Sequence, residues 1–131
     1  VEQGLKDLQQ RKRLVLAEGL GGLGSPVTWE LTVAELAGNW GLETVLVVPV
    51  KLGSIAQTVA NVALARQHNV NLKGIILSCS QPISEQEIVD FTPISLLESL
   101  TKIPILGMIP YLENIEDISK LAHVASNLLW F

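Results

Sequence analysis

Four short apolar runs recur along this chain, and their spacing restricts the fold more than any other feature of the sequence. The runs are rich in Val, Ile and Leu and cover residues 14–17, 45–48, 74–77 and 103–106. Continuous apolar runs of this length are typical of strands that are covered on both faces of a parallel sheet. Their starts lie about thirty residues apart, which is the usual size of one strand with its crossover helix.

Segments with helical spacing lie before, between and after these runs. Apolar residues recur at three- and four-residue intervals in the ranges 2–10, 32–40, 54–67, 84–100 and 114–130. Ser54 is a candidate N-cap, Ser84 with Glu87 forms a capping-box pattern, and Pro93 must interrupt the helix that follows Ser84. The order predicts a three-layer α/β fold, with a parallel sheet and helices on both faces, because crossover connections are right-handed.

Composition predicts one domain over residues 1–131, since a chain with 48% hydrophobic and 17% charged residues has enough apolar side chains for a packed core. A net charge of −4 argues against a nucleic-acid partner, which would require a basic face. The apolar runs are far shorter than the roughly 18–20 residues that span a bilayer, and no secretory signal is visible. We therefore expect a cytoplasmic protein with no membrane partner.

The residues that follow each predicted strand are the candidate site, because open parallel sheets bind ligands beyond the carboxyl ends of their strands. After the first strand, Glu18 precedes four glycines within residues 19–24. Such a loop lets backbone N–H groups approach an anion, and the Glu18 carboxylate can hold Mg²⁺. The alternative is a long flexible turn with a solvated Glu. No Gly-Lys-Ser/Thr phosphate-loop motif occurs here or elsewhere in the chain.

After the second strand, Gly53 and Ser54 start a helix whose free N–H groups and dipole favour a carboxylate or a phosphate. Lys51 adds a positive charge nearby. The alternative is an ordinary strand-to-helix turn with an exposed lysine.

The last two strand ends are less distinctive. Ser78 lies in a polar segment that can hydrogen-bond a nucleotide base or is simply a loop, and Cys79 fits a small buried residue better than a nucleophile. Pro110 and Tyr111 can pack against a flat ring. On the residues alone, a hydrophobic turn with a helix N-cap at Asn114 is the favoured interpretation of this last segment.

Three segments, taken together, resemble dethiobiotin synthetase: Leu-Ala-Glu-Gly-Leu-Gly-Gly at 16–22, Val-Lys-Leu-Gly-Ser-Ile at 50–55 and Gly-Met-Ile-Pro-Tyr-Leu at 107–112. The similarity covers nearly the whole chain but only about the back three-fifths of a typical member. It implies a P-loop-like fold that lacks the N-terminal phosphate-loop portion. It also implies a ligase of biotin biosynthesis, which uses ATP and Mg²⁺ to join 7,8-diaminononanoate to CO₂ or bicarbonate and closes the ring of dethiobiotin.

The resemblance also implies a role for individual residues, although it assigns no catalytic side chain to this chain. Glu18 matches the Mg²⁺ ligand, and the residues that match the nucleotide site are Glu18, Gly19, Leu20, Gly21, Ser78, Pro110, Tyr111 and Asn114. Residues 53–55, Gly53, Ser54 and Ile55, match the helix start that binds the substrate carboxylate, which the family contributes across a homodimer interface.

Two departures from the family pattern bear on activity. Position 78 is usually Asn in the family, and the Ser78 hydroxyl does not offer the paired donor and acceptor of an amide. The phosphate loop, its Lys and a second acidic metal ligand have no counterpart here, so we expect no dethiobiotin formation by this chain alone. Two other interpretations remain open: a non-catalytic synthetase-like binding or regulatory module, and another P-loop amide ligase such as a cobyric-acid enzyme.

Overall fold

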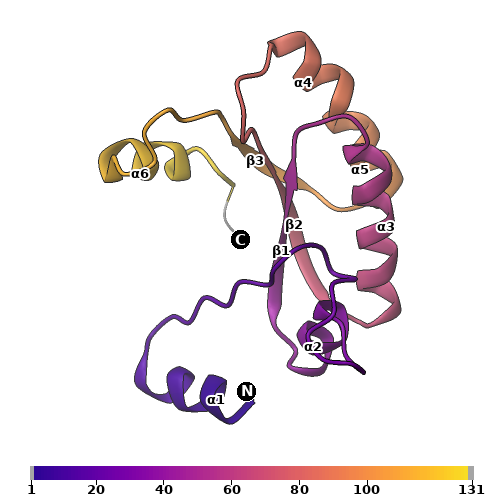
Figure 1. Ribbon diagram of the computed structural model, residues 1–131, viewed down its shortest axis with the longest axis vertical. Coiled ribbons are helices and arrows are strands. Elements are labelled where there is room, and N and C mark those ends of the chain that lie inside the picture. Colours follow the sequence, from indigo (N-terminus) through magenta and orange to yellow (C-terminus); the bar gives the residue numbers. More distant parts are fainter. Residues whose placement is uncertain (1, 130–131) are drawn as a thin grey trace.

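A computed structural model describes residues 2–129, in which three parallel strands form one sheet in the order β1-β2-β3. The strands are β1 (Glu43–Pro49), β2 (Asn71–Ser78) and β3 (Ile105–Ile109). The helices around them are α1 (Glu2–Arg11), α2 (Val33–Asn39), α3 (Ser54–Gln67), α4 (Glu85–Phe91), α5 (Ile94–Thr101) and α6 (Ile118–Ser126). The predicted α/β architecture with a parallel sheet is confirmed (Figure 1).

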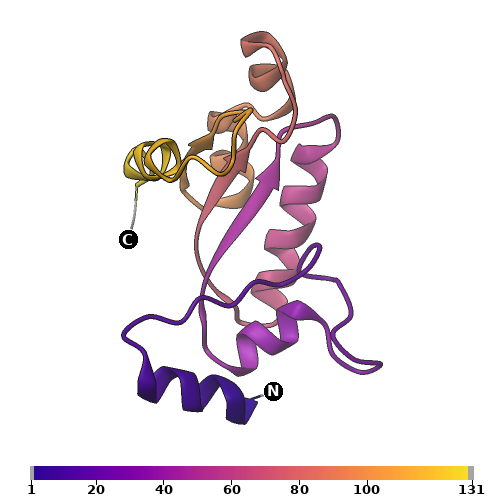
Figure 2. The same cartoon turned by 60° about the vertical axis from the view of Figure 1, so that its left-hand side comes forward.

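The central strand β2 divides the apolar core into two sides. Ile75 and Leu77 are fully buried on the side of α3 and α5, where Leu97 joins them. Ile76 points to the opposite side and packs against Leu106 and Leu128. Figures 1 and 2 show α3 and α5 together on one face of the sheet, with α6 on the other. The period-two alternation of a strand produces this two-sided burial.

Most predicted helices occur where the sequence places them. The segment that starts at Ser84 is broken at Pro93, so α4 ends at Phe91 and α5 begins at Ile94. The last helix is shorter than predicted and begins after Asp117, whose carboxylate accepts a hydrogen bond from the Lys120 N–H. No helix within residues 2–129 is long and apolar enough to cross a bilayer.

The predicted N-cap at Asn114 is therefore wrong. The Asn114 side chain instead accepts a hydrogen bond from the Glu116 N–H at 2.9 Å, within the turn that precedes α6. A side chain caps a helix only where the backbone starts to coil, and that point lies three residues later. Trp130, at the end of the predicted helix, lies outside the described residues.

The predicted first strand is also wrong. Residues 14–17 are irregular, and the Leu14 and Leu16 side chains are 83% and 92% exposed. An apolar run becomes a strand only when a neighbour pairs with its backbone, and no backbone hydrogen bond joins this segment to β1 among the described residues. The coil instead crosses to the α3 side of the sheet (Figure 1).

The capping boxes make stability depend on pH. At α4, the Ser84 N–H and hydroxyl donate to the Glu87 carboxylate, which lowers the pKa of Glu87 below its ordinary value of 4.5. A lowered folded-state pKa contributes stability above the ordinary pKa, and this contribution is lost as the pH falls through the folded-state value. Glu35 forms the same arrangement with Thr32 at α2, and the pKa of Glu35 is lowered in the same way.

We expect Glu87→Gln to flatten the decline in the free energy of unfolding between about pH 6 and about pH 3, because glutamine keeps an acceptor oxygen but does not titrate. Urea unfolding at a series of pH values measures this slope. Glu85→Gln removes the same charge from the same helical turn outside the capping box and is the matched control. Equal slopes for the two variants would contradict the prediction.

Candidate functional site at the carboxyl edge of the sheet

Three strand ends meet at one edge of the sheet. Pro49 of β1 pairs with Ser78 of β2, and Ser78 pairs with Ile109 of β3. The Val50 N–H donates to the Ser78 carbonyl at 2.9 Å, which extends this pairing beyond β1. Neighbouring strands lie about 4.8 Å apart, so the turn after β1, Ser78 and Pro110 are close neighbours. The structure thus brings together the sequence-predicted groups that follow these three strands.

Gly53 opens α3 in a left-handed conformation, with φ of +91°. A Cβ atom at this position would meet no heavy atom within 4 Å, so the backbone angle alone favours glycine. The predicted N-cap at Ser54 is wrong, because the cap is Gly53 and Ser54 is the first helical residue.

The Ser54 hydroxyl is committed to the turn itself. It is fully buried, lies 2.5 Å from the Pro49 carbonyl oxygen and 2.7 Å from that of Lys51, and accepts a hydrogen bond from the Lys51 N–H. These contacts use its one proton, shared between two carbonyl oxygens, and one of its two acceptor sites, and burial closes the other site to a ligand. Ser54 therefore holds the backbone of the turn in place and leaves its side chain no capacity for a ligand.

The start of α3 nevertheless presents free backbone donors. The Ile55 and Ala56 N–H groups have no acceptor among the described residues, as is normal in a first helical turn. Lys51 lies exposed two residues before Gly53. Unpaired N–H groups and the positive end of the helix dipole together favour a carboxylate or a phosphate at this position.

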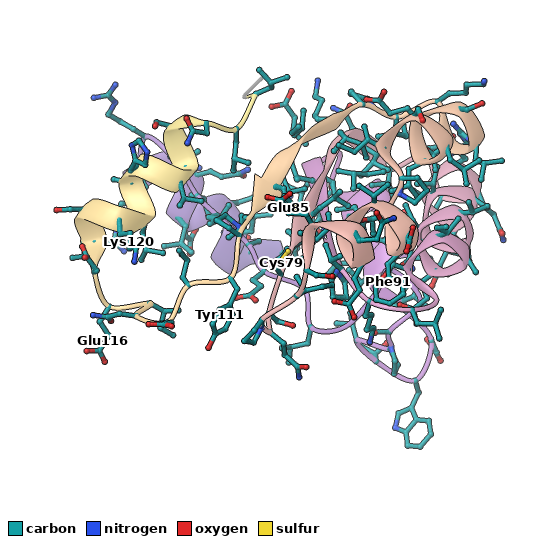
Figure 3. All side chains as sticks on the ribbon, turned by 90° about the horizontal axis from the view of Figure 1, so that it is seen from above. Cys79, Glu85, Phe91, Tyr111, Glu116 and Lys120 are labelled. Carbon is teal, nitrogen blue, oxygen red and sulfur yellow. The ribbon has the colours of Figure 1, made fainter. Side chains whose placement is uncertain are left out.

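Ser78 and Tyr111 are the accessible polar groups on the other side of this edge. The Ser78 hydroxyl is half-buried and has no hydrogen-bond partner in the described part of the chain. Tyr111 is 41% exposed on the coil after β3 and lies across the sheet from Phe91 of α4 (Figure 3). Asn114 is exposed three residues further along the coil.

Cys79 is a packing residue. Its thiol is buried and donates to the Met108 sulfur at 3.8 Å. Burial raises the pKa of the Cys79 thiol, so the thiol stays neutral and is a poor nucleophile.

The glycine-rich loop lies elsewhere. Leu23 is buried against Ala34 and Ala65, and its N–H donates to the Asn61 side chain in the second half of α3. Asn61 is eight residues beyond Gly53, or about 12 Å along the helix axis at about 1.5 Å per residue. The structure therefore does not place this loop at the turn that opens α3.

Glu18 is available to a cation. Its side chain is exposed, and it forms no ion pair or hydrogen bond with any described residue. No group of three or more His, Cys, Asp or Glu side chains converges within residues 2–129. Mg²⁺ usually takes one or two protein carboxylates and completes its shell with water and phosphate oxygens, so a single free carboxylate fits such an ion.

The sequence analysis did not predict that Asn61 contacts the glycine-rich loop. An asparagine inside a helical stretch has low helix propensity, which hints at a special contact. Its partner lies 38 residues away, however, and nothing in the local pattern identifies it.

Comparison with known proteins identifies the family of the chain. A family profile described as an AAA domain matches residues 1–119. The chain belongs to this family. It is 80% identical over 128 residues to ATP-dependent dethiobiotin synthetase BioD of Crocosphaera subtropica, a match that covers 98% of this chain and 58% of that protein. The resemblance to dethiobiotin synthetases is confirmed.

Two further relatives carry the same name. The protein of Gloeothece citriformis is 67% identical, over 92% of this chain and 54% of its own length. That of Synechocystis is 51% identical, over 96% of this chain and 54% of its own length. The chain thus spans little more than half the length of the curated relatives it matches.

The left-handed start of α3 gives a direct prediction. We expect Gly53→Ala to lower the free energy of unfolding by about 1–2 kcal/mol, because the alanine Cβ disfavours positive φ. Urea unfolding of the purified chain measures this loss. Gly4→Ala is the control, since Gly4 lies in α1 with open space around it and alanine is the better helix former. A loss at Gly53 no larger than that at Gly4 would contradict the prediction.

Proposed function

We propose that residues 1–131 form a single domain of an ATP- and Mg²⁺-dependent dethiobiotin synthetase, a ligase of biotin biosynthesis. The observation that carries this proposal is the 80% identity over 98% of the chain to a protein of that name. The edge where the turn after β1, Ser78 and Pro110 meet is the corresponding binding site. ATP use and a polar organic acid as substrate fit a cytoplasmic enzyme.

The start of α3 binds the carboxylate of 7,8-diaminononanoate in this proposal. The Ile55 and Ala56 N–H groups are unpaired, and Gly53 holds the turn so that they face outward from the helix end. Lys51 adds a formal charge of the right sign. Ser54 contributes by fixing the turn, through the three contacts of its buried hydroxyl.

In this proposal the nucleotide spans the distance between this edge of the sheet and the glycine-rich loop, which contacts α3 at Asn61. We assign its base to Ser78, Pro110, Tyr111 and Asn114, and its phosphates and cation to Glu18, Gly19, Leu20 and Gly21. ATP supplies the phosphoryl group that activates the carbamate of the diamine with CO₂ or bicarbonate. On this chain Glu18 holds the Mg²⁺, and the exposed glycines keep side chains away from the phosphates.

We also propose that two copies of the chain form a homodimer. An apolar groove of about 620 Å³ runs along the outer side of α3, from Leu52 and Gly53 past Ala60 to Ala63, between Phe91 and Leu100. Leu52 is 82% exposed at its end. Pairing of two copies along this groove would cover apolar surface and place a partner chain next to the carboxylate site.

We expect calorimetry to detect binding of Mg-ATP and of 7,8-diaminononanoate to the chain, with no turnover in the presence of bicarbonate. Glu18→Ala should weaken Mg-ATP binding about tenfold or more, because the cation loses a charged ligand. Glu30→Ala, an exposed carboxylate beyond the loop, is the matched control. The methyl ester of the diamine should bind about tenfold more weakly than the free acid, since it lacks the charge that the helix end favours.

Turnover at rates typical of the enzyme would refute the expected inactivity of the chain alone. Equal affinity of the wild-type chain and Glu18→Ala for Mg-ATP would contradict the role of Glu18 as the Mg²⁺ ligand. Equal binding of the ester and the acid would contradict carboxylate binding at the start of α3.

The dimer proposal is tested by Ala60→Glu, which places a charge in the apolar groove. We expect this variant to shift the chain from dimer towards monomer in sedimentation and light-scattering measurements, because burying an unpaired carboxylate is costly. Gln67→Glu adds the same charge to the same helix outside the groove and should leave the dimer intact. A wild-type chain that stays monomeric over a wide concentration range would contradict the proposal.

A further inference from the structure

The exposed half of the glycine-rich loop lies against Val33 at Gly19 but forms no hydrogen bond of its own within residues 2–129. Residues 18–21 are exposed and form no hydrogen bond with any other described residue. Order begins at Leu23, whose carbonyl accepts from the Ala34 N–H at 2.9 Å and whose side chain is 4% exposed. The position of Glu18 therefore depends on how firmly Gly22 and Leu23 are attached.

One hydrogen bond joins this loop to α3, beside the packing of Leu23 against Ala65. The Leu23 N–H donates to Asn61 Oδ1 at 2.8 Å, across 38 residues of sequence. Asn61 Nδ2 in turn donates to the Gln57 carbonyl at 2.8 Å, one turn earlier in the same helix. The second bond fixes the side-chain rotamer and the assignment of its two amide atoms, because a carbonyl takes only the donor and an N–H takes only the acceptor.

Gly22 makes this approach possible. A Cβ atom at Gly22 would lie 3.0 Å from Asn61 Oδ1, closer than ordinary van der Waals contact. A side chain at this position would require Asn61 to shift by a few tenths of an ångström, which strains its hydrogen bond to Leu23. The loop and the helix are therefore fitted to each other at this point, by a glycine on one side and an amide on the other.

We infer that Asn61 is a positioning residue, which sets the place of Glu18 and the glycines relative to the start of α3. The inference rests on the proposed function, in which the loop binds Mg-ATP and the helix start binds the second substrate. Because Asn61 lies on the same rigid helix as Gly53, one hydrogen bond ties the two binding elements into a single unit. Asn61 touches neither ligand itself and acts through the Leu23 backbone.

Amide hydrogen exchange followed by NMR tests the attachment without any ligand. We expect Asn61→Ala to raise the exchange rate of the Leu23 amide at least about tenfold, while the Val62 and Ala65 amides in α3 stay protected. Asn61→Asp keeps an acceptor for the Leu23 N–H but cannot donate to the Gln57 carbonyl, so it should restore only part of the protection. Gly22→Ala keeps Asn61 but displaces it, and should raise the exchange rate as Asn61→Ala does.

Calorimetry with Mg-ATP tests the consequence for binding. Asn61→Ala should weaken Mg-ATP binding about tenfold, the effect of losing one hydrogen bond that orders a binding loop. Gln67→Ala, at the end of the same helix, is the control and should bind like the wild-type chain. The affinity for 7,8-diaminononanoate should not change, whereas a general loss of structure would lower both affinities.

The outcomes separate this inference from the proposed function. A wild-type chain that binds no Mg-ATP overturns the proposed function. The exchange rates then still show whether Asn61 attaches the loop at Leu23 to α3. Unchanged exchange at Leu23 in Asn61→Ala overturns the inference. So does faster exchange with unchanged Mg-ATP affinity, since the hydrogen bond would then have no bearing on the site.

Discussion

The burial of the central strand β2 between α3 and α5 holds the candidate site together. Ile75 and Leu77 are fully buried there, and Val62 of α3 and Leu97 of α5 contact the same cluster. This packing fixes α3 against the sheet, and with it the direction in which the helix start points. The register of β2 with its two neighbours then brings three strand ends to one edge. Positioning of polar groups at the site is thus a consequence of apolar contacts well below it.

The site combines backbone groups and side chains with different degrees of order. The turn from Pro49 to Ser54 is fixed by internal hydrogen bonds to the buried Ser54 hydroxyl, although residues 51–53 are exposed. Residues 18–21 are exposed and form no hydrogen bond with any other described residue, whereas Leu23 is bonded to Asn61 and Ala34. In the proposed function, such a loop can adapt to phosphates and a cation, whereas the helix start needs no rearrangement to receive an anion.

Local sequence patterns predicted the elements whose cause is local. The capping box at Ser84 and the break at Pro93 occur where the pattern places them. The apolar run at 14–17 failed as a strand because strand formation needs a pairing partner, which no local pattern supplies. Ser54 was recognised as important, but its hydroxyl serves the turn and Gly53 is the cap. The contact between Asn61 and Leu23 joins residues 38 positions apart. No local pattern predicts it, just as no local pattern showed that the run at 14–17 lacks a pairing partner.

The proposed carboxylate site at the start of α3 draws its donors from the main chain, and this affects how its specificity can change. Every residue except proline carries the same amide, so replacements at positions 55 and 56 leave the recognition chemistry intact. Gly53 is the position where a substitution would disturb the site, because its φ of +91° sets the direction of those amides. Changes of side chain at positions 55 and 56 would therefore leave the substrate preference at this end of the site unchanged. A substitution that unwinds the first turn of α3 would alter it.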